Sequence, residues 1–321
     1  MEQANPRQPV ALIVGVTGMA GVAFTEALKK PAALGGPWVV YGVSLRPLPI
    51  WFPSSLLNKH IISPDSKLSH VTLQTGTKQY LGPIFDPVLS TQLVPRDAPF
   101  IEDYPRLPFP NFYYALEDIL ASYSKSLTYS IHRSSVIIGA STRSYYNSLL
   151  TLSVYALVCK HENYPLRYFG NKYSWEHFWD MSDARVLAEQ QIWASVTEKA
   201  KNEAFNCTNG DVFTWKMIWK VLCDVFGLEF VPFDEKEKFD FVDFMKDKGQ
   251  VWERIVEENG LYKTKMEEIT CVEAIDTILK FEIQHVCSMN KSRELGFHGY
   301  ANTLKSIPEW VDKYRQMKIL P

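Results

Sequence analysis

Long hydrophobic runs are absent from this sequence of 321 residues. The longest weakly polar stretch, VALIVGVTGMAGVAF at 10–24, is interrupted by three glycines. It is also shorter than the ~20 apolar residues that a membrane-spanning helix requires. The residues before it, MEQANPRQP, lack the basic region that opens a signal peptide. We therefore expect a cytoplasmic protein that has no membrane partner.

A surplus of charge of one sign is also absent. The chain has 34 basic and 36 acidic residues, which give a formal net charge of -2. Proteins that bind nucleic acid usually carry a basic patch or stripe, and blocks of like charge mark interaction tails. The composition therefore argues against a nucleic-acid partner and favours a small molecule as the ligand.

Cysteine is sparse, and its spacing excludes the common metal and redox motifs. The cysteines form neither a CxxC nor a CxxH pair, and they are Cys159, Cys207, Cys223, Cys271 and Cys287. An odd number of dispersed cysteines is typical of reduced thiols in a cytosolic protein. We accordingly expect no metal site.

The N-terminal half alternates strands with helices. A continuous apolar run at 10–15 predicts a buried strand, which a glycine-rich turn, a helix and a second strand at 38–46 follow. Two further strands, around 70–75 and 128–132, are separated by a helix at about 111–125. This alternation predicts an α/β fold with a Rossmann-like, doubly wound parallel sheet.

From residue 144 onward, longer amphipathic stretches replace the alternation. We expect an NADP-binding domain at 1–143 and a mainly helical substrate-binding part at 144–321, some segments of which return to the sheet. A helical part that covers the carboxyl edge of a parallel sheet would place a ligand at that edge. The charged run at 234–248 is expected to be the solvated face of a helix.

The turn after the first strand has the spacing GxxGxxG. Glycines let the backbone turn tightly and approach a pyrophosphate, which the N-terminus of the following helix then stabilises. Because the turn lies between a strand and a helix, we expect a dinucleotide site rather than a merely structural turn. The expected cofactor contacts are Gly15, Thr17, Gly18, Met19, Ala20 and Gly21.

The end of the second strand indicates which dinucleotide is bound. NAD enzymes keep an acidic residue there for the ribose diol, whereas this chain has Ser44, Leu45 and Arg46. A guanidinium without a neighbouring carboxylate suits a 2′-phosphate, so the expected cofactor is NADPH. The alternative is that Arg46 is an ordinary surface residue before Pro47.

A tyrosine pair lies in the segment NFYYALED. In short-chain dehydrogenases a lysine follows the catalytic tyrosine by four residues and lowers the pKa of the phenol. Here Glu117 follows Tyr113 by four residues, so Tyr113 is either a core aromatic or uses a cation from elsewhere. Lys78 can supply that cation, because it follows the third strand directly, after Thr75 and Gly76 on the nicotinamide side.

Seven segments together resemble the progesterone 5β-reductase/iridoid synthase family, atypical short-chain dehydrogenases of plants: GVTGMAG, WVVYGVSLR, LQTGTKQYLGP, FPNFYYALED, SIHRSSVIIGAS, NCTNGDVFTW and SMNKSRELGF. The resemblance implies an enzyme that reduces the C=C bond of an enone or enal by hydride transfer from NADPH to the β-carbon. It also implies that Tyr113 holds the carbonyl oxygen as this becomes an enolate, with Lys78 as its partner.

Within that family, IHRSSVIIGAS and NKYSWEHFWDMSDARVLAEQQIWA are more similar to the iridoid synthase branch. Ile84 and Ile275 fall where steroid-type members tend to carry Phe, which implies a more open substrate pocket. The implied substrate is 8-oxogeranial, whose reduced enol or enolate closes to nepetalactol. The alternatives are progesterone, as a Δ4-3-oxosteroid, and a general enone. A homodimer is a further expectation.

The sequence departs from the family between Arg46 and Lys78, where only 31 residues remain. A doubly wound sheet needs two further strands with their helices here, so roughly fifty residues are expected to be missing near Ser63 and Pro64. Their loss would leave strand edges unpaired. Two competing hypotheses remain. One is an inactive truncated relative, and the other is a conventional NADP-dependent alcohol dehydrogenase, which the missing Tyr-Lys helix pair disfavours.

Overall fold

The computed structural model describes residues 8–44, 46–58, 68–94 and 96–321 of the chain. The first βαβ unit forms where the sequence predicts it. It consists of β1 (Val10–Val14), α1 (Met19–Leu28) and β2 (Val39–Val43), and its two strands are parallel. The apolar residues of α1 are mostly buried, which agrees with a helix that covers a sheet.

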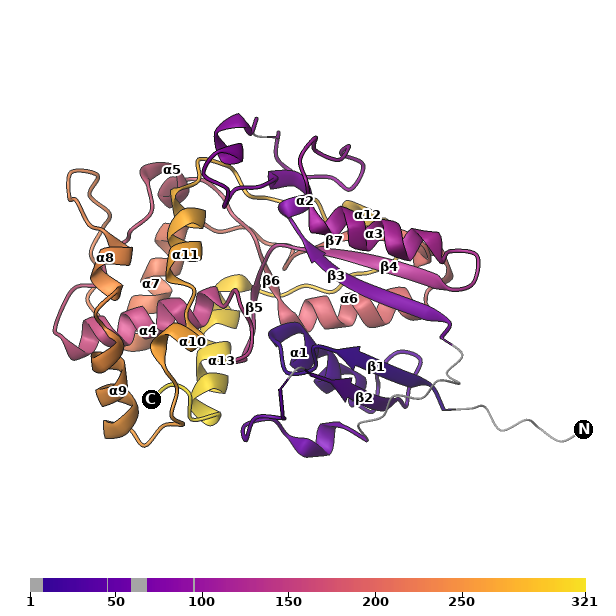
Figure 1. The fold of residues 1–321 in the computed structure, drawn as a ribbon, viewed down its shortest axis with the longest axis horizontal. Coiled ribbons are helices and arrows are strands. Elements are labelled where there is room, and N and C mark those ends of the chain that lie inside the picture. The colour runs from indigo at the N-terminus through magenta and orange to yellow at the C-terminus, as the bar shows by residue number, and fades with distance from the viewer. Residues whose placement is uncertain (1–7, 45, 59–67, 95) are drawn as a thin grey trace, which may run out of the picture.

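A second parallel sheet has the strand order β3–β4–β7. Its strands are β3 (His70–Gly76), β4 (Thr128–Ser134) and β7 (Glu203–Cys207). Figure 1 shows α3 (Phe112–Ser122) and α6 (Ala184–Val196) on opposite faces of this sheet. In β4 every residue from Ser130 to Ser134 is buried, so the carboxyl edge of the sheet lies inside the molecule.

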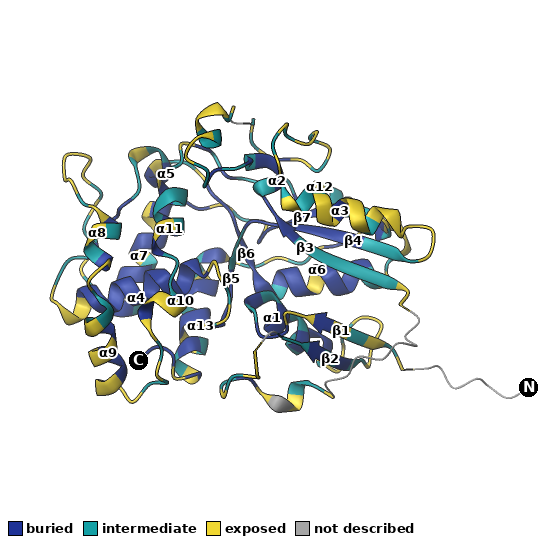
Figure 2. Cartoon of the chain, in the orientation of Figure 1, coloured by how far each residue is buried: buried dark blue, intermediate teal, exposed yellow. Residues whose placement is uncertain are grey.

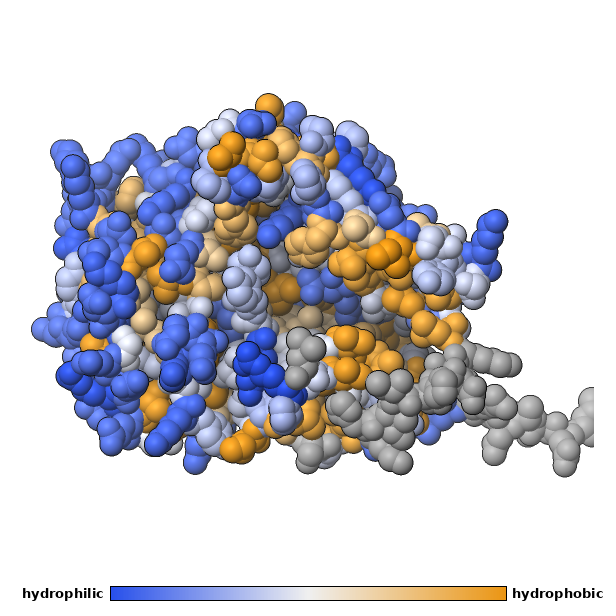
Figure 3. Space-filling view, in the orientation of Figure 1, coloured by the Kyte–Doolittle hydropathy of each residue, from blue (hydrophilic) through white to orange (hydrophobic). Residues whose placement is uncertain are grey.

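The two sheets are not joined by ladder hydrogen bonds in the part of the chain that the structure describes. On β1, Val10, Leu12 and Val14 are 57%, 56% and 80% exposed, and Figure 3 shows hydrophobic residues gathered at this place. Between β2 and β3 the described residues form only the 3-10 helix η1 (Ser54–Leu56). The expectation that central elements are missing from the sheet is confirmed. The predicted position of the gap, at Ser63 and Pro64, lies outside the described residues.

The helical part surrounds α4 (Ser148–His161). Asn147 caps this helix, because its side chain accepts a hydrogen bond from the Leu150 N–H. Every residue of α4 from Ser148 to Cys159 is buried, and Figure 2 shows most of this helix in the colour of buried residues. The helices packed against α4 include α7 (Trp215–Phe226), α9 (Gly249–Glu258), α11 (Val272–Lys280) and α13 (Thr303–Gln316).

Shorter elements complete the fold. A small parallel sheet pairs β5 (Val136–Ile138) with β6 (Met181–Asp183). The remaining helices are α2 (Lys78–Leu81), α5 (Lys172–Glu176), α8 (Phe241–Met245), α10 (Met266–Ile269), α12 (Asn290–Glu294), and the 3-10 helices η2 (Leu89–Gln92) and η3 (Glu198–Ala200). Over the described ranges, no helix is both long enough and apolar enough to cross a membrane.

The charged run at 234–248 is not one helix, so the prediction for it is wrong. Within this run only α8 is helical, and Asp240 caps it by accepting a hydrogen bond from the Asp243 N–H. The rings of Phe239, Phe241 and Phe244 lie 5.0 to 6.3 Å from the ring of Tyr155 in α4, measured between centroids. The aromatic rings therefore hold this segment against α4, and most of its charged side chains are exposed, as predicted.

Candidate active site

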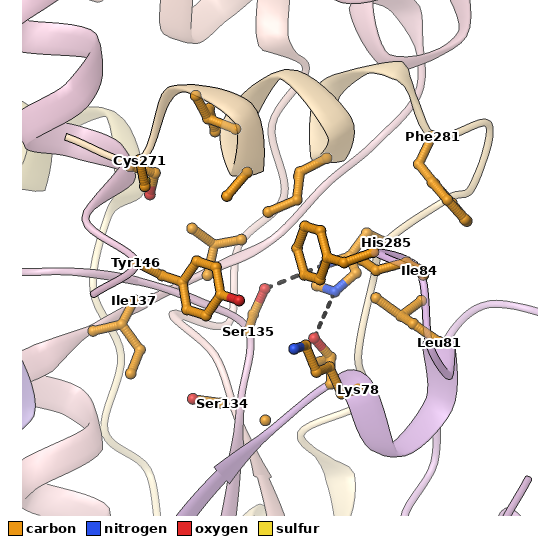
Figure 4. A pocket seen from close by; sticks show the side chains of 18 of the residues that line it. Lys78, Leu81, Ile84, Ser134, Ser135, Ile137, Tyr146, Cys271, Phe281 and His285 are labelled. Carbon is orange, nitrogen blue, oxygen red and sulfur yellow. Dashed lines mark hydrogen bonds between the residues drawn. The ribbon is translucent and has the colours of Figure 1, made fainter. Parts of the chain in front are cut away.

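A pocket lies at the carboxyl ends of β3 and β4, where the α/β part meets the helical part (Figure 4). The end of β3, the turn into α2, the start of β5 and one side of α11 contribute most of its largely apolar wall. Seven of the residues predicted for the site line this pocket: Met19, Thr75, Gly76, Lys78, Ile84, Tyr113 and Ile275. The fold thus brings both catalytic candidates together with both substrate-pocket candidates.

Lys78 begins α2 directly after the turn that ends β3. Backbone bonds hold this turn, since the Thr77 N–H donates to the Ser134 carbonyl at 3.0 Å and the Asn111 side chain donates to the Lys78 carbonyl at 3.0 Å. The Lys78 Nζ lies 4.8 Å from the centroid of the Phe85 ring and 5.5 Å from that of Tyr146. Partial burial lowers the pKa of Lys78.

Tyr113 lies in the first turn of α3, where Asn111 caps the helix by accepting a hydrogen bond from the Tyr113 N–H at 3.0 Å. Its phenol reaches over the end of β3, because a Cβ added to Gly76 would stand 3.4 Å from the Tyr113 oxygen. Burial raises the pKa of Tyr113, and the nearby Tyr146 phenol raises it further. The phenol is therefore a neutral hydrogen-bond donor that faces the pocket.

Glu117, which stands where short-chain dehydrogenases have their lysine, is occupied elsewhere. It is only 6% exposed, and its two carboxylate oxygens accept hydrogen bonds from Arg133 at 3.2 and 3.1 Å. The Arg133 guanidinium therefore pairs with the carboxylate and compensates its charge. The adjacent Tyr114 is a structural tether, because its hydroxyl accepts from the Leu107 N–H and donates to the Gln79 carbonyl.

The glycine-rich turn has the geometry of a dinucleotide-binding turn. Gly15 has a φ of +81° with open space on its side-chain side, and a Cβ on Gly21 would lie 2.2 Å from the Gly15 oxygen. Gly21 therefore lets α1 pack closely on the turn. Gly18 precedes α1 without a side-chain cap. Thr17 lies in the turn, whereas Met19 and Ala20 are the first two residues of α1; their contacts with a cofactor stay a prediction.

The Thr75 hydroxyl is fully buried and has no hydrogen-bond partner among the residues that the structure describes. An orphaned donor beside the pocket fits a site that a nicotinamide group would complete. At the end of β2, Arg46 is exposed, and its carbonyl accepts a hydrogen bond from the Ser44 hydroxyl. Leu45 lies outside the described residues. The residues present thus fit a dinucleotide cofactor.

Several pocket residues escaped the sequence analysis. Phe85 and Tyr146 stack at a centroid distance of 5.7 Å beside Lys78, and Ser135 and His285 line the same pocket. No local pattern could have found them, because they come from separate segments. The nearest signal was the cluster SYYN at 144–147, whose second tyrosine lies in the pocket.

Comparison with known proteins gives consistent matches. The profile of the PRISE-like Rossmann-fold domain matches residues 54–321. An (S)-8-oxocitronellyl enol synthase of Catharanthus roseus is 42% identical over 363 residues, which cover 97% of this chain and 92% of that protein. A 3-oxo-Delta(4,5)-steroid 5-beta-reductase of Arabidopsis thaliana is 41% identical over 374 residues, which cover 100% of this chain and 95% of that protein.

The alignment with the Arabidopsis protein also bears on the missing segment. It has 374 positions, whereas the chain has 321 residues, so at least 53 positions have no residue in this chain. That length agrees with the loss of roughly fifty residues that a strand, helix, strand and helix require.

Solved structures agree on the fold. A UDP-glucose 4-epimerase matches with a TM-score of 0.61 at 14% sequence identity, over 96% of this chain and 98% of that chain. This likeness confirms the Rossmann-like fold and, at so low an identity, nothing further. The family model and the sequence relatives show that the chain belongs to the PRISE-like Rossmann-fold family of oxidoreductases, as the resemblance implied.

Proposed function

We propose that this protein reduces the activated C=C bond of an enal or enone and leaves the carbonyl group in place. One observation carries the proposal. Lys78 and Tyr113 line the same largely apolar pocket beside Thr75 and Gly76, where the nicotinamide end of a bound dinucleotide would lie. Such a pair suits a substrate whose oxygen becomes negatively charged during the reaction.

The cofactor would be NADPH, which supplies a hydride for the β-carbon when it is bound. The glycine-rich turn would hold its pyrophosphate, and Arg46 would pair with its 2′-phosphate. These roles fit the open space at Gly15 and the exposure of Arg46. The unpartnered Thr75 hydroxyl would contribute a hydrogen bond at the nicotinamide end.

The protein's own groups would stabilise the developing enolate. The neutral phenol of Tyr113 donates a hydrogen bond to the carbonyl oxygen, and the ammonium of Lys78 stabilises its negative charge. Among the described residues no carboxylate lies within ion-pair distance of Lys78. The aromatic faces of Phe85 and Tyr146 flank the ammonium instead, so its charge remains available to the substrate.

The preferred substrate would be a linear enal of the 8-oxogeranial type, whose reduced enol or enolate closes to a nepetalactol-type product. Ile84 and Ile275, which are smaller than phenylalanine, line the pocket, and the Catharanthus relative carries the name of an enol synthase. A Δ4-3-oxosteroid such as progesterone is the alternative, because the Arabidopsis relative carries the name of a steroid reductase.

The test supplies the chain with 8-oxogeranial, progesterone or a small enone, each with NADPH or NADH, and identifies the products by mass spectrometry. We expect a saturated carbonyl product or an iridoid, with NADPH as the better cofactor. Accumulation of the unsaturated alcohol would contradict the proposal, because it would show that the carbonyl carbon received the hydride.

A second candidate is a non-catalytic relative that acts by interaction. The observation that favours it is that no ladder hydrogen bonds join β1 and β2 to the sheet of β3 among the described residues, since the cofactor would have to bind to both parts. Fluorescence titration with NADPH separates the two candidates. No binding at millimolar NADPH would favour the non-catalytic relative.

A further inference from the structure

A cluster of four buried polar side chains lies in the wall of the pocket: Thr77, Ser135, Asp180 and His285. Each is at most 8% exposed, and all except Asp180 line the pocket itself. Figure 4 shows His285 between Ser135 and the Lys78 turn. The roles of Lys78 and Tyr113 do not require this cluster, so its position beneath them needs a separate explanation.

His285 joins two parts of the molecule through its two ring nitrogens. Its Nε2 lies 2.9 Å from the Thr77 hydroxyl, although the two residues are 208 positions apart in the sequence. Its Nδ1 lies 3.2 Å from the Ser135 hydroxyl and 3.3 Å from an Asp180 carboxylate oxygen. The histidine therefore bridges the turn after β3 to a site that β5 and β6 hold in place.

The far side of this bridge is fixed. The second carboxylate oxygen of Asp180 accepts a hydrogen bond from the Cys287 N–H at 2.6 Å, and the Ser135 hydroxyl donates to the Asp180 carbonyl at 3.0 Å. The imidazole also stacks on Trp179 at a centroid distance of 5.2 Å. A ring held in this way can restrain the side chain of Thr77 on its other side.

Thr77 immediately precedes Lys78. Apart from the bond with His285, the described residues give the Thr77 hydroxyl no hydrogen bond. Three aromatic rings lie 4.8 to 5.8 Å from the Lys78 ammonium, which has no hydrogen bond or ion pair among the described residues. We propose that His285 is a positioning residue, which holds Thr77 and thereby fixes the turn that places the Lys78 ammonium in the pocket. The consequence for turnover rests on the proposed function, whereas the placement of Lys78 does not.

His132 provides a matched control. It is as buried as His285 and bonds to a serine hydroxyl, Ser130, at 3.0 Å and to Gln190 at 2.8 Å. It lies in β4 and does not line the pocket. Substitutions of His132 therefore show how the loss of a buried, hydrogen-bonded histidine alone affects the labelling of Lys78, because they leave the turn after β3 in place.

The two amide substitutions of His285 separate its two bonds. The amide of glutamine reaches about as far as Nε2, so His285→Gln can keep the bond to Thr77. The amide of asparagine reaches about as far as Nδ1, so His285→Asn can keep the bond to Ser135 but not the bond to Thr77. Thr77→Val removes the bond between Thr77 and His285 by changing Thr77 instead, and it keeps the shape of the side chain.

The experiment measures the accessibility of Lys78 by competitive labelling with acetic anhydride and peptide mass spectrometry, with exposed Lys125 as the internal reference. We expect His285→Asn and Thr77→Val to raise the relative labelling rate of Lys78 about fivefold, which is the effect of losing one hydrogen bond. His285→Gln and the matched His132→Asn and His132→Gln variants should stay within about twofold of the parent chain.

Equal labelling of Lys78 in His285→Asn and His285→Gln would overturn the proposal, because it would show that the bond to Thr77 is irrelevant. An unchanged labelling rate of Lys78 in Thr77→Val would also overturn it. This variant decides the question if circular dichroism shows that His285→Asn unfolds. The labelling needs neither cofactor nor substrate, so a failure of the proposed reaction leaves this result intact. Where turnover is measurable, kcat should fall in the same two variants while KM stays unchanged.

Discussion

The β1–α1–β2 unit and the helical part around α4 differ sharply in how well they are covered. Three of the five residues of β1 are more than half exposed, whereas twelve of the fourteen residues of α4 are buried. The backbone of a strand forms its hydrogen bonds with neighbouring strands, whereas the backbone of a helix forms them within the helix. The loss of a chain segment therefore opens the sheet and leaves the helical part intact.

The proposed site spans this difference. Lys78 and Tyr113 lie in helices next to the β3–β4–β7 sheet, and most of the pocket wall comes from the ends of its strands, from β5 and from α11. The glycine-rich turn and Arg46 belong to the open unit, which α1 connects to the rest by packing against α6. The substrate end of the site is thus better supported than the cofactor end.

The largest effect should come from restoring the missing segment. Inserting the corresponding segment of the Arabidopsis relative between Ser63 and Pro64 should close the sheet, raise the midpoint of thermal unfolding by ~5–10 °C and lower the NADPH dissociation constant at least ~tenfold. A Gly/Ser linker of the same length is the control, because it restores length without strands. No gain over the linker would show that β1 does not need the segment.

Leucine-to-alanine substitutions in α4 and β1 should show the difference between the covered helix and the exposed strand directly. Leu150 in α4 is fully buried, so Leu150→Ala should lower the free energy of unfolding by ~2–5 kcal/mol. Leu12 in β1 is 56% exposed, so Leu12→Ala should change it by no more than ~0.5 kcal/mol. Urea denaturation of the two variants measures both. If Leu12→Ala lowered the free energy of unfolding nearly as much as Leu150→Ala, another chain would have to cover β1 in solution.

Tyr113→Phe should lower kcat by ~10², because the lost hydrogen bond forms chiefly in the transition state. Its effect on thermal stability should be small. Tyr114→Phe is the control, and it should keep turnover but lower stability by ~1 kcal/mol, since it loses the bonds to Leu107 and Gln79. Tyr113→Phe and Tyr114→Phe should both be measured in the present chain and in the chain with the segment restored. Full activity of Tyr113→Phe in the restored chain would make this tyrosine a packing residue.

Arg46→Ala should give the smallest effect, a loss of about tenfold in the preference for NADPH over NADH, with NADH binding unchanged. Fluorescence titration with both dinucleotides measures this preference. The effect should be weaker in the present chain than in the restored chain, because the open unit holds Arg46 less firmly. An unchanged preference in both chains would return Arg46 to an ordinary surface residue.

Local patterns in the sequence predicted the elements well. The apolar run before the glycine-rich turn forms β1, and the helix expected at about 111–125 extends from Phe112 to Ser122. The prediction that this strand is buried is wrong, because three of its five residues are exposed where no further strand among the described residues covers them. The pairing of Tyr113 with Lys78 came from the resemblance and from the position of Lys78 after a strand, and the fold places both in one pocket. These features depend on periodicity, turn residues and strand order, all of which a single sequence records.

The sequence by itself also determined that the sheet would be incomplete, because 31 residues between Arg46 and Lys78 cannot supply two strands and their crossovers. Only the tertiary structure decided how the site is supported. The pairing of Glu117 with Arg133 and the bond between His285 and Thr77 each join residues of separate segments. Such contacts depend on which side chains the packed elements bring within hydrogen-bond distance, and no local pattern encodes that distance.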